Sequence, residues 1–198
     1  MCLIFIANQC HPGYPLVIAA NRDEFYQRPS LPAAFWKDRP DILSGIDQQA
    51  GGTWLGVTSG GNIAALTNYR DPKLIDLSAP SRGALVKDFL VDKTPPEKYL
   101  QNIQSGDVRY NPFNLLAGEL SPGANMSFHY YSSIENSIST VPPGVHGLSN
   151  ELLDTPWPKV EKGKAAIEAL IREGGHIDPE ALFEIMGDDV APPDDRLP

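Results

Sequence analysis

The segment Cys2–Ala20, CLIFIANQCHPGYPLVIAA, contains two unbroken apolar runs. The runs Cys2–Ala7 and Leu16–Ala20 are rich in β-branched residues, and His11–Pro15 between them has the glycine and prolines of a turn. This pattern predicts an antiparallel β-hairpin. Because neither run alternates with polar residues, both faces of the hairpin are expected to be covered, which places it in the interior of a layered sheet.

Further strand patterns follow along the chain. Residues 26–50 are rich in proline, aspartate and glutamine and predict a long surface loop. Beyond this loop, short strands are expected at Trp54–Val57, Ile63–Thr67, Phe113–Ala117, Met126–Tyr131 and Ile138–Val141. The first two are joined around Ser59-Gly60-Gly61, and the last three predict a meander.

Four helices are expected between and after these strands. Ser81 is a candidate N-cap for a helix with an apolar stripe, and Thr94-Pro95-Pro96-Glu97 is a second helix start, with proline at the first helical position. The clearest helix follows Pro156-Trp157-Pro158 and ends at Gly174-Gly175, and Asp178-Pro179 opens a last one through Met186. Strands with hairpin connections and interspersed helices indicate an α+β layered fold. No linker divides the chain, so residues 1–198 are expected to form a single domain.

The charge balance limits the classes of partner. The chain has 16 basic against 25 acidic residues and a formal net charge of −9. An acidic surface repels phosphate backbones and anionic lipid, so we expect no nucleic-acid partner and no stable membrane insertion. No cluster of histidine, cysteine and carboxylate residues has the spacing of metal ligands, so no metal site is expected.

Cys2 and Cys10 are the only cysteines of the sequence. Eight residue steps of about 3.3 Å along one strand would hold them beyond disulfide distance. Free thiols indicate a reducing compartment. The apolar opening has no basic flank and is too short for a signal peptide or a membrane span, so a cytoplasmic location is expected.

Cys2 is the first candidate for chemistry. A cysteine at the start of a strand is most often a small buried apolar residue. However, an initiator methionine is commonly removed before a small second residue, and removal of Met1 would leave Cys2 with a free α-amine. Such an amine has a pKa of about 7.7–8.0 and is a competent general base for its own thiol.

Arg22 and Asp23 directly follow the second strand of the hairpin. In an antiparallel hairpin the end of the second strand lies opposite the start of the first, so these residues are expected within about 12 Å of Cys2. A guanidinium there would lower the pKa of the thiol, and a carboxylate would orient the α-ammonium. The alternative is a polar turn with both side chains in solvent.

Two asparagines and a glycine-rich segment complete the candidate site. Gly51-Gly52-Thr53-Trp54-Leu55-Gly56 indicates tight turns or a close backbone approach, without the lysine of a phosphate-binding loop. Asn68 and Asn150 each follow an expected strand. Asparagine is common in turns, but each amide could instead donate a hydrogen bond to an oxyanion.

In this order, the motifs resemble those of the NRDE family, also called the transport and Golgi organisation family. The resemblance rests on Asn21-Arg22-Asp23-Glu24, Gly51–Gly56, Thr67-Asn68-Tyr69-Arg70, Ser81-Arg82-Gly83, Phe113-Asn114-Leu115, Gly147-Leu148-Ser149-Asn150 and Pro156-Trp157-Pro158-Lys159. It extends from Met1 to about Met186. The family is in turn similar to N-terminal nucleophile hydrolases.

The resemblance implies a four-layer αββα sandwich. It assigns Cys2 as the nucleophile, Arg22 and Asp23 as the pair beside it, and Asn68 and Asn150 as the oxyanion and amine-anchoring residues. Members of the family continue into further strands, so this chain is expected to lack the C-terminal strands of the sandwich. The implied activity is hydrolysis of an amide or thioester bond of a small acyl substrate.

A second function stays open at this point. The same cleft would suit a non-catalytic binding or trafficking protein for haem or an acyl ligand, with His146, expected in a loop, as the best candidate for an axial ligand. No haem attachment motif is present, and no other cofactor is expected. A Cys2–His146 dyad ranks last, and the oligomeric state is left open.

Overall fold

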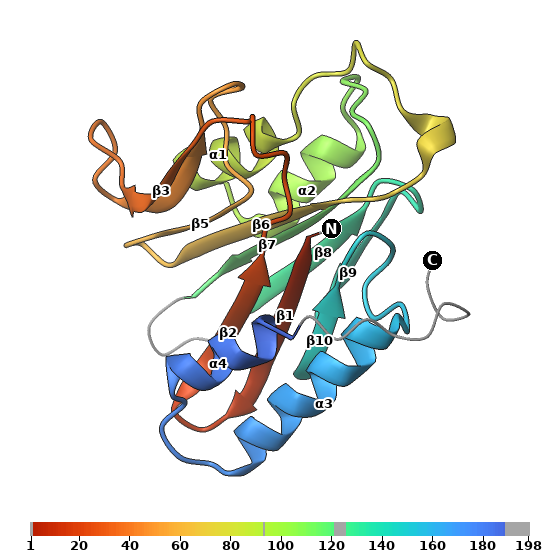
Figure 1. The fold of residues 1–198 in the computed structure, drawn as a ribbon. Helices are drawn as coiled ribbons and strands as arrows, with labels where there is room; N and C mark the ends of the chain where they lie inside the picture. Colours follow the sequence, from red (N-terminus) through yellow and green to blue (C-terminus); the bar gives the residue numbers. More distant parts are fainter. Residues whose placement is uncertain (1, 93, 121–125, 189–198) are drawn as a thin grey trace. The chain divides into compact units, whose positions relative to one another are not determined.

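The computed structural model describes residues 2–92, 94–120 and 126–188 (Figure 1). Met1, whose removal would give Cys2 a free α-amine, lies outside these ranges. The chain divides into two compact units, Met1–Asp23 with Pro142–Pro198, and Glu24–Val141. We call them the first and the second unit.

The first unit is built on a three-stranded antiparallel sheet in the order β10-β1-β2 (Figure 1). Its strands are β1 (Leu3–His11), β2 (Tyr14–Asn21) and β10 (Gly144–Leu148). The hairpin predicted from the opening segment is confirmed, with Leu3 opposite Asn21 and Ile6 opposite Ile18.

The two strands of this hairpin differ in their surroundings. β1 is the central strand, and Ile4, Phe5, Ile6 and Ala7 are at most 2% exposed. β2 is an edge strand and most of its residues are half-buried, so the predicted interior position is wrong for β2. Its unbroken apolar run does not require two neighbouring strands, because the last helix packs against one of its faces.

Two helices pack on the first unit's sheet. They are α3 (Pro158–Arg172) and α4 (Pro179–Met186), and both begin with proline, as was predicted for α4. In α3 the buried side is Val160, Gly163 and Ile167. A Cβ atom on Gly163 would lie 2.0 Å from Cζ of Phe5, so only glycine allows this close approach of helix and strand.

The second unit holds a seven-stranded antiparallel sheet in the order β3-β4-β5-β6-β7-β8-β9. The strands are β3 (Ser30–Phe35), β4 (Ile42–Asp47), β5 (Leu55–Thr58), β6 (Asn62–Asn68), β7 (Phe113–Glu119), β8 (Ser127–Ser132) and β9 (Ser137–Thr140). Every strand pairs with its sequence neighbour, which confirms the predicted strand pair around Ser59-Gly60-Gly61 and the predicted meander.

The prediction of a long loop over residues 26–50 is wrong, because β3 and β4 lie within it. All six residues of β3 are exposed, and it contains Pro32, which a sheet tolerates at its edge. Arg28, two residues before β3, forms a 2.6 Å ion pair with Asp47 at the end of β4. An exposed, proline-containing edge strand has the composition of a loop, which is why the pattern did not reveal it.

Helices α1 (Gly83–Val91) and α2 (Pro96–Gln104) pack on one face of this sheet, as Figure 1 shows. A 3-10 turn, Pro72–Leu74, precedes them. The predicted stripe on α1 is confirmed, since Leu85, Val86, Phe89 and Leu90 are buried. Tyr99 on α2 donates a 2.7 Å hydrogen bond to the carbonyl of Leu85, which ties the two helices together.

Within the described ranges, no helix combines the length and apolarity that a membrane crossing requires.

Candidate functional site

Cys2 lies immediately before β1 and is half-buried. Its Sγ is 4.0 Å from the backbone carbonyl oxygen of Asp23, to which the thiol donates a long hydrogen bond. Its own carbonyl accepts a 2.9 Å hydrogen bond from Oγ of Ser149. The predicted proximity of Cys2 and Asp23 is therefore confirmed, and the residue is held through both its side chain and its backbone.

The strand register explains why these groups meet. Leu3 pairs with Asn21 on β2, and Ile4 pairs with Leu148 on β10. The residues that follow both flanking strands therefore lie at the Cys2 end of the sheet. Arg22 and Asp23 come from the β2 side, and Ser149 and Asn150 come from the β10 side.

Ser149 is a contact that the sequence alone did not reveal. It is 2% exposed, and its Oγ also lies 3.4 Å from Oδ1 of Asn150. The motif Gly147-Leu148-Ser149-Asn150 was recognised, but its role was assigned to the asparagine because amides are common oxyanion donors. The hydroxyl is the group that holds the backbone of Cys2.

His146 belongs to β10 and not to a loop, so its predicted placement is wrong. It is 8% exposed, its Nδ1 is 2.7 Å from Oδ2 of Asp154, and its Nε2 is 3.0 Å from the carbonyl of Pro142. Because both ring nitrogens face acceptors, the protonated imidazolium satisfies both. The hydrogen bond to Asp154 raises the pKa of His146, against the opposing effect of burial.

Asp154 is the centre of this small network. Lys164 donates a 2.5 Å hydrogen bond to Oδ1 of Asp154, and the backbone N–H of Gly147 donates another of 3.0 Å. Burial alone would raise the pKa of the carboxyl, but the hydrogen bonds from His146, Lys164 and Gly147 outweigh it and lower the pKa to about 2. The network fixes the loop after β10 to α3.

The strand register excludes the Cys2–His146 dyad, which ranked last among the interpretations of the sequence. His146 pairs with Ile6, four residues from Cys2, which corresponds to about 13 Å along the strand. A haem iron could bind His146 only if one of the two hydrogen bonds of its ring were broken. In the described part of the chain, no group of three or more metal-ligating side chains gathers.

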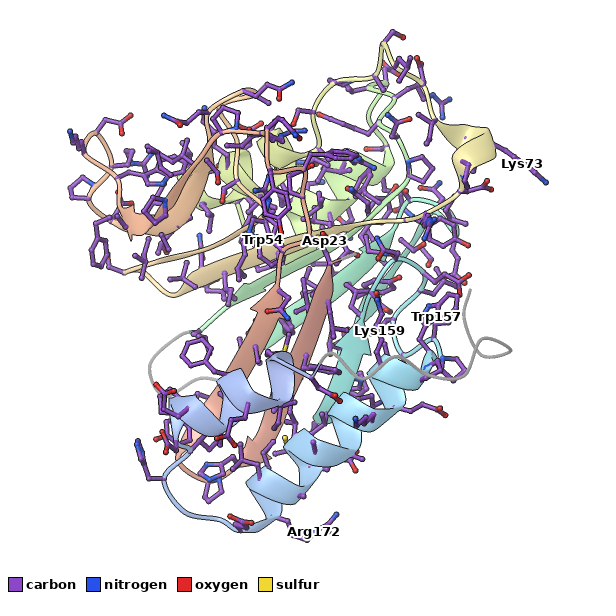
Figure 2. The ribbon with its side chains drawn as sticks, viewed as in Figure 1. Asp23, Trp54, Lys73, Trp157, Lys159 and Arg172 are labelled. Atoms are coloured by element: carbon purple, nitrogen blue, oxygen red, sulfur yellow. The ribbon has the colours of Figure 1, made fainter. Side chains whose placement is uncertain are left out.

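Lys159 lies in the first turn of α3. Like Ser149, it belongs to a motif of the family resemblance but was given no role from the sequence. Figure 2 shows Lys159 and Trp157 at the N-terminal end of this helix and Asp23 beyond the end of β2. The side chain is half-buried. Burial lowers the pKa of its ammonium group, and the charge of Cys2 acts in the opposite direction, so the two groups interact electrostatically.

The second unit contains the other family motifs. Asn68 is the exposed last residue of β6, and its proposed oxyanion role stays a prediction. Its neighbour Thr67 is fully buried and accepts a 3.1 Å hydrogen bond from Nδ2 of Asn114, whose Oδ1 accepts a 2.7 Å bond from the Tyr130 hydroxyl. These three polar groups satisfy one another inside the sheet.

The glycine-rich segment of this unit allows a close backbone approach, as predicted. A Cβ atom on Gly52 would lie 2.5 Å from the carbonyl carbon of Gly83, and the N–H of Thr53 donates a 3.1 Å hydrogen bond to the Gly83 carbonyl. Arg82, beside it, donates to the carbonyl of Pro112. These motif residues hold the start of α1 against the sheet.

The sequence is similar to that of a known protein family. The model of the family described as Transport and Golgi organisation 2 matches residues 1–198. The Transport and Golgi organization protein 2 homolog of Bos taurus is 40% identical over 190 residues, covering 92% of this chain and 68% of the relative. The Homo sapiens homolog is 44% identical over 172 residues, covering 83% of this chain and 62% of the relative. The chain therefore spans about two thirds of these relatives' lengths.

Among solved structures, the chain is similar to the Caenorhabditis elegans ortholog of N-acylethanolamine-hydrolyzing acid amidase. The TM-score is 0.58 at 10% sequence identity, and the match covers 95% of this chain and 86% of that one. At this identity the likeness concerns the fold. It confirms the predicted α+β architecture of the N-terminal nucleophile hydrolase type.

Proposed function

The chain belongs to the Transport and Golgi organisation 2 family, and from that premise we propose that it is an N-terminal-cysteine hydrolase of amide or thioester bonds in small acyl substrates. The observation that supports this most is the placement of Cys2. Its thiol faces the end of β2, and its backbone is anchored by Ser149. A solved structure of similar fold carries the name of an acid amidase, which suits the same class of reaction.

The proposed reaction has two steps. After removal of Met1, Sγ of Cys2 attacks the acyl carbon while the α-amine of Cys2 takes the thiol proton. The C–N or C–S bond of the substrate then breaks, and the resulting ammonium returns a proton to the leaving group. Water hydrolyses the acyl-cysteine and regenerates the thiol.

The neighbouring groups have proposed roles in this scheme. The guanidinium of Arg22 favours the thiolate, and the carboxylate of Asp23 orients the α-ammonium. Asn150 and backbone N–H groups donate hydrogen bonds to the oxyanion that forms on the substrate. The proposed location is the cytoplasm, because Cys2 and Cys10 are both free thiols and suit a reducing compartment.

The test compares two forms of the protein that differ only at the N-terminus. One begins at Cys2, as checked by intact mass, and the other carries one residue before it that cannot be removed. Both are assayed against a panel of acyl-amides and acyl-thioesters. We expect turnover only from the processed form, because an amine within a peptide bond has lost its basic lone pair.

Two other outcomes would contradict this proposal in different ways. Equal rates from the two forms would show that the α-amine is not the base. Inactivity of both forms towards every substrate would favour the ligand-binding alternative.

A further inference from the structure

The three lysines in the first half of α3 have different partners. Lys162 forms an ion pair with Asp188, and Lys164 binds Asp154. Lys159 forms no ion pair with a carboxylate within the described part of the chain. Its side chain is half-buried, and burial lowers the pKa of its ammonium group. A half-buried cation without a carboxylate needs another source of negative charge to offset its desolvation.

One path of contacts brings Lys159 to Cys2 through β10. Ser149 binds the carbonyl of Cys2, and Gly147 lies two residues before it. A Cβ atom on Gly147 would be 2.6 Å from Cγ1 of Val160, so the first turn of α3 packs directly on this end of β10. Lys159 is the residue before Val160.

A second path runs through β2 and α4. Leu3, next to Cys2, pairs with Asn21, whose Nδ2 donates a 2.6 Å hydrogen bond to the carbonyl of Met186 at the end of α4. Asp188 follows two residues later and pairs with Lys162. Lys162 is one helical turn after Lys159, on neighbouring positions of the same helix surface. Both paths therefore place the first turn of α3 at the Cys2 end of the sheet.

We propose that Lys159 is the cationic partner of Cys2, which holds the thiol as a thiolate beside the first turn of α3. Its role is to position charge at the nucleophile, and it forms no bond to substrate. A stabilised thiolate is the form of cysteine that attacks acyl carbon, so the inference deepens the proposed hydrolase function and rests on Cys2 as its nucleophile.

Other charged groups at this end of the sheet also influence the pKa of the Cys2 thiol. Arg22 and Asp23 follow β2, Glu151 follows β10, and Asp188 follows α4. Asp154 is held by His146 and Lys164. In the processed form the α-amine of Cys2 is also present. The experiment must separate Lys159 from these groups, and above all from the α-amine.

The experiment measures the rate at which iodoacetamide alkylates Cys2 as a function of pH, with Cys10 replaced by alanine so that only Cys2 reports. Lys159→Met removes the charge and keeps the length of the side chain, while Lys159→Arg keeps the charge. Lys162→Met is the matched control, because it removes one lysine charge one turn away on the same helix. All variants are made in the processed form and in the form with one fixed residue before Cys2.

We expect Lys159→Met to move the midpoint of the alkylation profile to higher pH by about one unit or more, as loss of a nearby opposite charge does. Lys159→Arg is expected to have a midpoint close to that of the parent, and Lys162→Met is expected to have the same midpoint as the parent. The shift must occur in both N-terminal forms. A purely structural lysine would lower thermal stability without moving the midpoint.

Equal midpoints for the parent and Lys159→Met would overturn the inference. A shift confined to the processed form would also overturn it, because the lysine would then act on the α-amine. The hydrolysis assay run in parallel tests the proposed function separately. A shifted alkylation profile without any hydrolysis would support Lys159 as the cationic partner of Cys2 and would contradict the proposed hydrolase function.

Discussion

At the residue scale, Cys2 and Cys10 offer a comparison within one strand. Both thiols are free and half-buried. Cys2 precedes β1 beside Asp23, whereas Cys10 lies near the other end of β1 and packs on the cluster around Phe5 and Ile167. Burial raises the pKa of the Cys10 thiol, so Cys10 is the less reactive of the two by that criterion.

We therefore expect Cys2→Ala to abolish hydrolysis and Cys10→Ala to leave it nearly unchanged. Cys2→Ser is expected to keep a small fraction of the rate, since a hydroxyl is the poorer nucleophile at neutral pH. Initial rates on the best substrate of the panel measure all three. Full activity of Cys2→Ala would exclude Cys2 as the nucleophile, whatever the substrate.

Ser149 gives a second prediction at this scale. Ser149→Ala removes the hydrogen bond to the Cys2 carbonyl and leaves that acceptor without its hydroxyl partner. We expect a loss of about 1–3 kcal/mol in unfolding free energy by denaturant titration, with a lower hydrolysis rate. Ser137→Ala is the control, because its hydroxyl makes only an exposed bond to Glu135. Equal stability of Ser149→Ala and the parent would mean that the bond contributes nothing.

The site residues show what a sequence can and cannot indicate. Asp23 was predicted beside Cys2 because hairpin geometry fixes which residues share an end of the sheet. Lys159 is 157 positions away in the sequence, and its proximity depends on how α3 packs on β10. Hydrophobic periodicity predicts that such a helix exists but does not determine its position on the sheet.

At the element scale, the contact between α3 and β1 depends on Gly163. An alanine Cβ there would lie 2.0 Å from the Phe5 ring, and Phe5 is only 1% exposed. We expect Gly163→Ala to lower the unfolding free energy by about 1–3 kcal/mol, although alanine stabilises a helix by about 1 kcal/mol relative to glycine. Gly175→Ala is the control, because no atom lies within 4 Å of its Cβ position. A stabilised Gly163→Ala variant would contradict the packing.

The network of His146, Asp154 and Lys164 links β10 to α3 and predicts a pH dependence. The pKa of His146 is raised above its ordinary 6.5, so its contribution to stability is fully present below pH 6.5. That contribution is lost as the pH rises through the raised folded-state pKa. Asp154 acts oppositely: its contribution is present above its ordinary pKa of 3.8 and is lost as the pH falls through about 2.

The test compares the parent with His146→Gln by denaturant unfolding between pH 5 and pH 9. We expect the parent to be more stable by about 1–3 kcal/mol at pH 5, and the difference to shrink as the pH rises. The sign follows from protonation, because the folded state holds the imidazolium proton more tightly. A difference that grows with pH would show that His146 is neutral in the folded protein.

Most of the errors at this scale have a common physical cause. Three of the elements that were missed or misplaced, β3, β10 and β2, lie at sheet edges, whereas β4, which was also missed, lies between β3 and β5. An edge strand has one hydrogen-bonding neighbour and one open side, so its residues are not obliged to be apolar or β-branched. The central strands β1, β6 and β7 are buried on both faces, and each was predicted as a strand.

At the scale of the whole molecule, the α+β class was predictable because runs of strands with hairpin connections are interspersed with helices. The division into two units was not, because the first unit joins residues 1–23 to residues 142–198 across the whole second unit. Such a long-range pairing of β1 with β10 leaves no compositional boundary in the sequence. The fold type came from motif resemblance, and the comparison with a solved structure confirms it.

The alternative function, haem binding, is also a property of the whole molecule, since any of four histidines could serve. His11 and His146 have both ring nitrogens in hydrogen bonds, and His129 is 8% exposed with Nε2 bonded to Ser127. His176 is exposed, with Nδ1 bonded to the Tyr14 hydroxyl. An axial ligand needs a ring nitrogen with its lone pair directed at iron, so binding at His11 or His146 requires loss of a protein hydrogen bond.

We therefore expect a haem titration followed at the Soret band to show weak binding without saturation at one equivalent. Residual binding is expected to fall in His176→Ala, whose imidazole is the most accessible, and to be unchanged in His146→Gln. Saturation at one equivalent, lost in His146→Gln or in Cys2→Ala, would contradict this and favour the carrier function. In that event Cys2 or His146 would be an iron ligand, and the hydrogen bonds of His146 to Asp154 and Pro142 would have to open on binding, which the same pH series on the haem complex would detect.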